Sequence, residues 1–297
     1  GLSDVTVGEL RHTGELTRYR NKAQYPVAKD RQGNIKIGFF APKSHNVCDA
    51  CDCPLAPKEF ASILKLIKKK IEEYGISIYD EESGKGLLRH IYLRRSESTC
   101  EILLTLIING DSLPYANELS ADLCESFPNI CGILLNVNKA DTNVILGDKW
   151  ITLCGKDYIT DTLCGVELKI TAPSFYQVNR SVAEAIYKKA CELADLCEND
   201  TLLDLYCGAG SIGLSMAKSV KELIGIEIID SAVECAKYNA KANGIENARF
   251  FVGDAKNTEN LLSRAEEDLK RKIRALFTVS VCTQRSFTST ILEPRIE

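Results

Sequence analysis

The spacing of apolar residues along the chain changes near residue 172. Before this point, alternating or continuously apolar segments predict short strands together with two helical insertions. The expected strands cover residues 33–40, 87–95, 100–109, 130–138, 143–153 and 161–171. Residues 57–74 carry apolar side chains at helical spacing, with lysines on the opposite face, and this pattern predicts a helix.

After residue 172, segments with helical and strand periods alternate. The expected elements are a helix over 181–196, a strand over 201–206, a helix ending at 218, a strand over 223–228, a helix over 231–243 and a strand over 249–253. This β-α-β-α-β order is typical of a doubly wound parallel sheet. We therefore predict an α/β protein with two domains, a mixed α/β domain over residues 1–172 and a Rossmann-like domain over residues 173–297.

Composition and charge exclude several classes of protein. With 45% hydrophobic and 26% charged residues, the chain resembles globular proteins and not disordered, collagenous or coiled-coil ones. Its net charge of −4 excludes the overall positive field of a non-specific nucleic-acid binder. No apolar run reaches the length of about 18 residues that a membrane span needs, and the first residues lack the features of a secretory signal. The 13 cysteines are scattered, which predicts mostly buried thiols in a reducing cytoplasm.

A glycine motif lies between the first strand and the first helix of the second domain. Residues 201–213 read TLLDLYCGAGSIG, so Gly208, Gly210 and Gly213 fit the pattern G-x-G-x-x-G. Glycines at these positions let backbone N–H groups approach a polar or anionic ligand beside a helix N-terminus. By itself the pattern also admits NAD.

Three carboxylates near the ends of consecutive strands distinguish between the possible cofactors. Asp204 comes shortly before the glycines, where it would repel a pyrophosphate, and Glu227 ends the next strand, where a carboxylate accepts hydrogen bonds from ribose hydroxyls. Asp254 follows the third strand, beside the expected adenine position. These acids favour S-adenosylmethionine over NAD, although either Glu227 or Asp254 alone is also explained by capping of the following helix.

Several motifs together resemble the RNA 5-methyluridine methyltransferases, and most closely the 23S ribosomal RNA (uracil-5-)-methyltransferase branch. The resemblance covers about residues 15–260 and is carried by Tyr19–Val27 (YRNKAQYPV), Gly38–Phe40, Ser44–His45, Cys53–Leu55, Phe175–Asn179 (FYQVN) and Asp204–Gly210 (DLYCGAG). It implies a central RNA-binding α/β domain over residues 1–172. A Rossmann-like methyltransferase domain that binds S-adenosylmethionine would follow over residues 173–297 and would be incomplete after about residue 260.

The resemblance also implies the residues that bind the methyl donor. Together with the glycine motif, it places the donor contacts at Gln177, Tyr206, Gly208, Gly210, Ser211, Glu227 and Asp254. On the RNA side, Arg20 and Lys22 alternate beside Tyr19, and Arg89 and Arg94 form a second basic cluster on a predicted strand. Without the resemblance a solvated strand face explains these charges, but with it we expect Arg20, Lys22, Arg89 and Arg94 to contact RNA phosphates.

Three closely spaced cysteines and a histidine suggest a metal site. His45, Cys48, Cys51 and Cys53 can be interpreted as zinc ligands, but the single residue between Cys51 and Cys53 is too short for a usual tetrahedral knuckle. The resemblance instead implies a 4Fe-4S cluster in a full-length parent protein. Cys53 would supply one ligand, and the three expected upstream cysteines are absent from this chain.

The resemblance implies covalent catalysis, because C5 of uracil is a poor nucleophile. A cysteine thiolate adds to C6, C5 attacks the methyl group, and a base then removes the C5 proton as the cysteine leaves C6. The expected Asp-Pro-Pro-Arg and Ser-Cys-Asn-Pro loops and the Glu base are absent, and only Cys282 is a candidate nucleophile. The 43 residues after Asp254 are too few for the expected remaining strands, so we interpret the chain as a fragment.

These observations predict a parent protein that methylates C5 of a uridine in 23S ribosomal RNA with S-adenosylmethionine. Three alternatives stay open: a transfer-RNA (uracil-5-)-methyltransferase, a non-catalytic fragment that binds RNA and S-adenosylmethionine, and an NAD-dependent oxidoreductase. We expect a cytoplasmic monomer that has RNA as its partner and no contact with a membrane.

Overall fold

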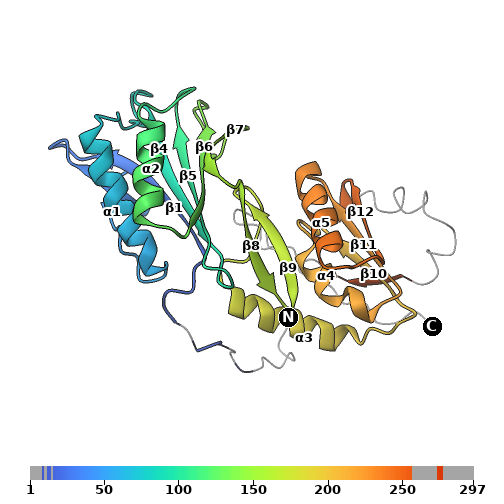
Figure 1. The fold of residues 1–297 in the computed structure, drawn as a ribbon. Helices are drawn as coiled ribbons and strands as arrows, with labels where there is room; N and C mark the ends of the chain where they lie inside the picture. The colour runs from blue at the N-terminus through green and yellow to red at the C-terminus, as the bar shows by residue number, and fades with distance from the viewer. Residues whose placement is uncertain (1–8, 10–11, 15, 256–272, 277–297) are drawn as a thin grey trace.

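The computed structural model describes residues 9, 12–14, 16–255 and 273–276 (Figure 1). The first part of the chain forms a seven-stranded sheet. Its strands are β1 (Lys22–Lys29), β2 (Ile35–Phe40), β3 (Val47–Asp49), β4 (Leu88–Arg95), β5 (Ile102–Ile108), β6 (Ile130–Val137) and β7 (Lys149–Gly155). Their order across the sheet is β3-β2-β1-β4-β5-β6-β7, with β5 and β6 parallel and the other neighbours antiparallel.

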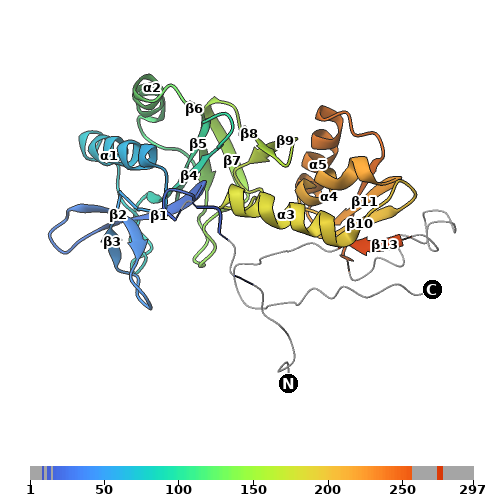
Figure 2. The same cartoon turned by 90° about the horizontal axis from the view of Figure 1, so that it is seen from below.

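Two helices, α1 (Lys58–Glu73) and α2 (Ala116–Ser126), cover one face of this sheet (Figure 2). The buried residues of α1 recur at helical spacing and are Phe60, Ala61, Ile63, Leu64, Ile67 and Ile71. The helix ends before Gly75, whose φ of +63° suits glycine and closes the last turn. The helix expected over residues 57–74 is therefore confirmed. In the described part of the chain, no helix is long and apolar enough to cross a bilayer.

A β-hairpin follows the large sheet. Strands β8 (Tyr158–Leu163) and β9 (Val166–Thr171) pair antiparallel through a two-residue turn at Cys164 and Gly165, with φ of +50° and +78°. Two consecutive left-handed residues are characteristic of a type I′ turn, which matches the twist of paired strands. The single strand expected over 161–171 was therefore wrong, because a cysteine in the first turn position is not a usual turn signal.

The second part of the chain forms a four-stranded parallel sheet in the order β12-β11-β10-β13. Its strands are β10 (Thr201–Leu205), β11 (Glu222–Glu227), β12 (Ala248–Val252) and β13 (Ile273–Leu276). Its helices are α3 (Arg180–Ala194), α4 (Ser211–Met216), the 3₁₀ turn η1 (Ala217–Ser219) and α5 (Asp230–Ala242). The order reverses at β10, as in a doubly wound sheet, which gives the predicted Rossmann-like fold. We predicted no strand after residue 253, whereas the structure has Ala275 and Leu276 in β13.

The hairpin lies between the two sheets (Figure 1). One apolar core includes Tyr92 and Leu134 of the large sheet, Leu168 of the hairpin, and Leu202 and Phe250 of the parallel sheet. The chain on both sides of residue 172 therefore contributes to one continuous core, and this core holds the parallel sheet against the hairpin.

A buried carboxylate also ties the hairpin to its neighbours. Asp161 of β8 accepts hydrogen bonds from the backbone N–H groups of Glu97 (3.2 Å), Ser98 (3.0 Å) and Thr162 (2.9 Å). It also accepts one from the Tyr176 hydroxyl at 3.2 Å. Asp161 thus connects the loop after β4, the hairpin and the segment that leads into α3.

Candidate functional site

The glycine loop leaves the carboxyl end of β10 in a left-handed backbone conformation. Tyr206, Gly208 and Gly210 have φ of +59°, +54° and +81°. A Cβ atom at Gly210 would lie 3.1 Å from Leu214 and 3.2 Å from Phe250, so this position combines a positive φ with close packing. Gly210 therefore lets the loop pack closely against Phe250 of β12.

The Asp204 side chain of β10 binds the backbone at the end of the glycine motif. Its carboxylate is buried and accepts a hydrogen bond from the Gly213 N–H at 3.0 Å. A Cβ atom at Gly213 would lie 2.8 Å from the same carboxylate oxygen, which explains the third glycine of the motif. Asp204 therefore links β10 to α4 and also places a negative charge beneath the loop.

Glu227, the last residue of β11, faces the same loop. Its two carboxylate oxygens accept hydrogen bonds from the backbone N–H groups of Gly208 (3.1 Å) and Ile229 (3.0 Å). A carboxylate has about four acceptor positions, so these two bonds fix its orientation and leave capacity for a ligand. The neighbouring Ile228 and Ile229 side chains are 62% and 57% exposed. An oriented carboxylate beside exposed apolar side chains suits a ligand that has both a diol and an apolar ring.

The other predicted donor residues lie at the same edge of the sheet. The Gly253 N–H donates to the backbone oxygen of Glu227 at 2.9 Å, which places Asp254 beside the end of β11. The Ser211 hydroxyl, at the start of α4, lies 3.1 Å from the Tyr187 hydroxyl of α3. The residues at the carboxyl ends of β10, β11 and β12 are Tyr206, Gly208, Gly210, Ser211, Glu227 and Asp254. Ligands of doubly wound sheets bind at this edge.

Asn239 of α5 is a site residue that the sequence did not reveal. Its side chain is fully buried; its Nδ2 donates to the Ala209 carbonyl at 3.0 Å, and its Oδ1 accepts from the Lys169 N–H at 2.8 Å. It therefore fixes the glycine loop to β9. Nothing in the local sequence distinguishes it from the other polar residues of its helix, because its burial depends on the packing of α5 against the hairpin.

The YRNK motif of the expected RNA-binding edge and the FYQVN motif, which are far apart in the sequence, meet in the structure. The Asn21 backbone N–H donates to the Val178 carbonyl at 2.9 Å, and its side chain donates to the Gln177 carbonyl at 2.8 Å. Arg20 forms an isolated antiparallel bridge with Asn179, whose side chain caps the start of α3. The YRNK and FYQVN motifs thus lie side by side. Within the described residues, no hydrogen bond joins the Gln177 side chain to the glycine loop. Gln177 therefore lies with the paired YRNK and FYQVN motifs.

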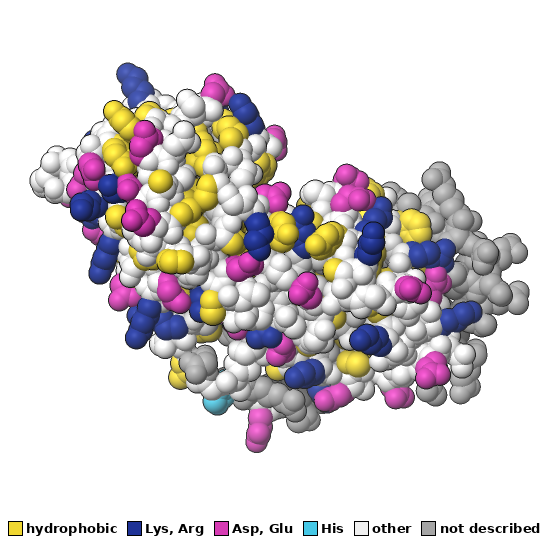
Figure 3. Space-filling model, in the orientation of Figure 1, with side chains coloured by type: hydrophobic (Ala, Val, Ile, Leu, Met, Phe, Trp, Pro, Cys, Tyr) yellow, Lys and Arg dark blue, Asp and Glu magenta, His cyan; other side chains and the backbone are white. Residues whose placement is uncertain are grey.

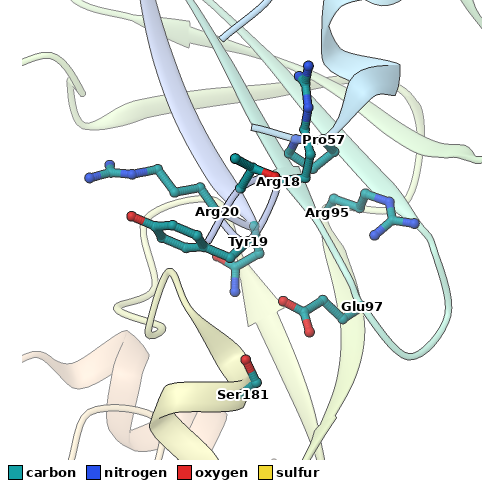
Figure 4. A pocket seen from close by; sticks show the side chains of 9 residues that line it. Arg18, Tyr19, Arg20, Pro57, Arg95, Glu97 and Ser181 are labelled. Carbon is teal, nitrogen blue, oxygen red and sulfur yellow. The ribbon is translucent and has the colours of Figure 1, made fainter. Parts of the chain in front are cut away.

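A cavity of about 320 Å³ lies beside these paired motifs (Figure 4). Its lining residues are Thr17, Arg18, Tyr19, Arg20, Asn21, Pro57, Arg95, Glu97 and Ser181. Tyr19 and Arg20 extend toward the same side in Figure 4, whereas Arg95 extends the opposite way. Arg18 and Arg95 form ion pairs with Asp52 and Glu59. Arg20 is exposed and makes no ion pair with the described residues.

Lys22 follows Asn21, which lines the cavity, and its surroundings destabilise the charged form of its side chain. Burial, together with the positive charges of Arg94 and Arg20, lowers the pKa of Lys22 from 10.5 to about 8. A bound anion would relieve this repulsion. Lys22 and Arg20 are therefore the two predicted RNA-contacting residues whose positions fit that role.

Arg89 and Arg94 do not fit it, because both are buried, with 3% and 2% of their surfaces exposed. Arg89 donates to the Asn138 and Ala140 carbonyls at 3.0 and 2.9 Å. Arg94 donates to the Tyr92 hydroxyl and to the Ser174 carbonyl. The sequence pattern of a basic strand indicated a surface, but β4 is a central strand with both faces covered. We therefore exclude Arg89 and Arg94 from the RNA interface.

The cysteine cluster gives no support for a metal centre. Cys48 is exposed, whereas Cys51 and Cys53 are half-buried, and the Cys51 thiol donates to the Ile37 carbonyl at 3.5 Å. Among the described residues, no group of three or more His, Cys, Asp or Glu side chains is arranged to hold a metal ion. The iron–sulfur prediction for Cys53 thus has no structural support. Cys282, the candidate nucleophile, lies outside the described residues.

The charges on the visible face give no further indication of a ligand. Figure 3 shows basic and acidic side chains interspersed over both sheets and no continuous area of either sign. The net charge of −4 likewise gives no overall positive field, so a nucleic-acid contact would depend on a local group of basic residues.

Replacing Asn239 tests whether it fixes the glycine loop. We expect Asn239→Ala to lower the free energy of unfolding by about 1–3 kcal/mol, because the Ala209 carbonyl and the Lys169 N–H lose their partner. Hydrogen–deuterium exchange of residues 207–213 should accelerate. Asn243→Ala is the matched control, since the Asn243 side chain binds Glu167 of β9 and the Asn239 backbone carbonyl and does not contact the loop. Equal exchange rates in the two variants would contradict the assignment.

Comparisons with known proteins show sequence similarity to RNA methyltransferases. The tRNA (uracil-5-)-methyltransferase family model matches residues 134–280. Proteins described as uncharacterized RNA methyltransferases from Clostridium tetani and Halalkalibacterium halodurans are each 40% identical over 86% of this chain. The chain covers 55% of each relative, so it spans about half their length.

A solved structure is similar as well. The tRNA (uracil-54, C5)-methyltransferase of Pyrococcus abyssi, determined in complex with S-adenosyl-L-homocysteine, superimposes with a TM-score of 0.68. The two sequences are 26% identical, and the match covers 82% of this chain and 57% of that protein. Together with the glycine loop, Glu227 and the paired motifs, these similarities show that the chain belongs to the RNA uracil-5-methyltransferase family.

Proposed function

We propose that the protein to which this sequence belongs transfers a methyl group from S-adenosylmethionine to C5 of a uridine in RNA. The observation that carries this proposal is Glu227, which is oriented by the Gly208 and Ile229 N–H groups at the edge where this fold binds ligands. Family membership supplies the reaction class. For the substrate we propose ribosomal RNA, on the resemblance of the YRNK and Cys-Pro-Leu segments, with transfer RNA as the alternative.

The residues at the sheet edge suit S-adenosylmethionine. Glu227 would accept hydrogen bonds from the ribose hydroxyls, and the exposed Ile228 and Ile229 side chains would contact the adenine ring. Asp204 and Asp254 place negative charge around a ligand that carries a sulfonium cation and no phosphate. NAD fits less well, because its pyrophosphate would lie above the buried Asp204 carboxylate. When bound, S-adenosylmethionine supplies an electrophilic methyl group.

The remaining predicted donor contacts belong to the same proposal. Gly208 and Gly210 would bring the backbone close to the donor, with Tyr206 and Ser211 at either end of the loop. Gln177 would approach from the segment before α3. We propose that residue 172 separates the RNA-binding part from the donor-binding part, because β9 ends at Thr171 and the segment that pairs with Asn21 follows it.

The covalent step needs a reactive cysteine, and Cys207 does not suit it. Cys207 lies in the glycine loop, but it is buried, and burial together with the Asp204 and Glu227 charges raises the pKa of its thiol far above neutrality. A thiol held in the neutral form is a poor nucleophile. We therefore exclude Cys207 as the nucleophile and keep Cys282 as the candidate in this sequence.

The RNA would contact the edge formed by the paired motifs. Arg20 is exposed and unpaired among the described residues, and Lys22 is a cation whose environment favours a neighbouring anion. Tyr19 lines the adjoining cavity and offers a ring on which a base can stack. Since Asn21 connects this edge to the FYQVN segment, RNA bound here would lie beside the start of the donor-binding part.

Methyl transfer to RNA tests the proposal directly. The protein is incubated with methyl-labelled S-adenosylmethionine and with ribosomal or transfer RNA lacking 5-methyluridine, and the nucleosides are then separated. Labelled 5-methyluridine from ribosomal RNA is the expected result. Label in transfer RNA alone would overturn the substrate assignment. Absence of label from both, with the donor still bound, would favour the non-catalytic alternative.

Glu227→Ala is expected to weaken binding of S-adenosylhomocysteine about 100-fold, because two hydrogen bonds to a charged acceptor are lost. Glu227→Gln keeps the size of the side chain and one acceptor oxygen. Its affinity for S-adenosylhomocysteine should lie between the affinities of Glu227→Ala and of the parent protein. Calorimetry gives the affinities, and thermal unfolding shows whether each variant is folded. Glu246→Ala, which removes an exposed acid after α5, is the control. Unchanged affinity in a folded Glu227→Ala variant would remove the ribose assignment.

Arg20→Ala and Lys22→Ala should each weaken RNA binding and lower the slope of log affinity against log salt concentration by about 1. Since the pKa of Lys22 is about 8, the affinity of the parent protein should also fall between pH 7 and pH 9 as Lys22 loses its charge. This fall should be reduced in Lys22→Ala. Arg31→Ala, on the exposed turn between β1 and β2, is the control. If the salt slopes of Arg20→Ala and Lys22→Ala equal that of Arg31→Ala, the RNA does not bind at this edge.

A further inference from the structure

Two cysteines of the large sheet and its covering helix lie in direct contact. The Sγ atoms of Cys124 in α2 and Cys154 in β7 are 3.2 Å apart. Both thiols are free and half-buried. Of the twelve cysteines that the structure describes, no other pair has sulfur atoms within hydrogen-bonding distance.

An irregularity in β7 produces this contact. The pairing of β6 with β7 shifts between Ile133 and Leu134, which are opposite Cys154 and Thr152. Leu153 is therefore an extra residue, and such a bulge changes the direction of the side chain that follows. Leu153 and Cys154 consequently both pack into the core beneath the helices, where regular alternation would separate them. Cys124 packs against the same core.

The two sulfur atoms are close to bonding distance. A disulfide has an S–S bond of about 2.05 Å, so the atoms need to approach by about 1.2 Å. Burial and the adjoining Cys154 thiol raise the pKa of Cys124 to about 11, so its thiolate is a minor species at pH 7, and oxidation through Cys124 should become faster as the pH rises. Cys131 on the neighbouring strand β6 is differently engaged, because its thiol donates to the Tyr158 carbonyl at 3.5 Å.

We propose that Cys124 and Cys154 form an oxidation site, at which a small-molecule disulfide converts the two thiols into an intramolecular disulfide. One cysteine, as its thiolate, attacks a sulfur of the oxidant and releases one thiolate of the oxidant, which leaves a mixed disulfide. The second cysteine, as its thiolate, attacks the protein sulfur of that mixed disulfide and releases the other half of the oxidant. Two electrons pass from the cysteine pair to the oxidant, which becomes two thiols, and the two cysteine protons are transferred to these products.

The disulfide would link α2 to the edge strand of the large sheet. It would connect residues 30 positions apart and so restrict the unfolded chain. The oxidised protein should therefore unfold at a temperature several degrees higher than the reduced protein. The two cysteines are not among the proposed donor-binding or RNA-binding residues, so the test of this site does not depend on methyl transfer.

The test uses the whole chain in buffers of oxidised and reduced glutathione. After equilibration, free thiols are alkylated, and the peptides are mapped by mass spectrometry without reduction. The expected result is a cross-linked peptide pair that contains Cys124 and Cys154 and that disappears on treatment with dithiothreitol. In Cys124→Ser, Cys154 should instead carry glutathione, and oxidation should no longer raise the unfolding temperature. Cys191→Ser, in which a half-buried cysteine of α3 is replaced, should behave like the parent protein.

Two results would overturn the proposal. One is that Cys124 and Cys154 are both alkylated, and so were still free thiols, in glutathione buffers that fully oxidise the exposed Cys197 to its mixed disulfide. The other is a disulfide that joins Cys154 to Cys131 instead of Cys124.

Discussion

The shape of the proposed donor site depends on two side chains that bind the backbone of the glycine loop. Glu227 accepts a hydrogen bond from the Gly208 N–H, and Asn239 donates one to the Ala209 carbonyl. Within the loop the Gly210 N–H donates to the Cys207 carbonyl, whereas the Gly208 N–H and the Ala209 carbonyl find their partners in side chains of other elements. The two side chains come from the next strand and its following helix, so the loop takes its shape only when the parallel sheet is assembled.

The hairpin of β8 and β9 connects this site to the large sheet. Asn239 reaches β9 through the Lys169 N–H, and Asp161 of β8 holds the loop after β4 together with Tyr176 of the FYQVN segment. The same segment pairs with Asn21 at the start of β1. A short run of residues before α3 is thus bound both by the hairpin and by the basic motif. This arrangement explains how two motifs separated by about 150 residues lie side by side.

The sequence was informative where a local pattern determines structure. The helix over 57–74, the strand–glycine–helix motif and Glu227 at a strand end all depend on neighbouring residues, and the structure contains each of them. Tertiary packing decided the rest. Arg89 and Arg94 are typical of a surface strand, yet β4 is central in its sheet.

Some strand limits also depended on distant contacts. The strand expected over 143–153 begins only at Lys149, because the Asn138 side chain binds the Val144 and Ile145 carbonyls and holds that segment in a loop. The sequence also did not predict the pairing of residues 273–276 with β10, because a four-residue strand is too short to show a recognisable period.

We propose that the edge formed by the glycine loop and Glu227 binds S-adenosylmethionine. Two calorimetric titrations of the protein, one with S-adenosylhomocysteine and one with NADH, test this binding. S-adenosylhomocysteine should bind at one site per chain, and NADH should give no binding heat. Binding of NADH, or absence of S-adenosylhomocysteine binding to the folded protein, would show that this edge is not a site for S-adenosylmethionine.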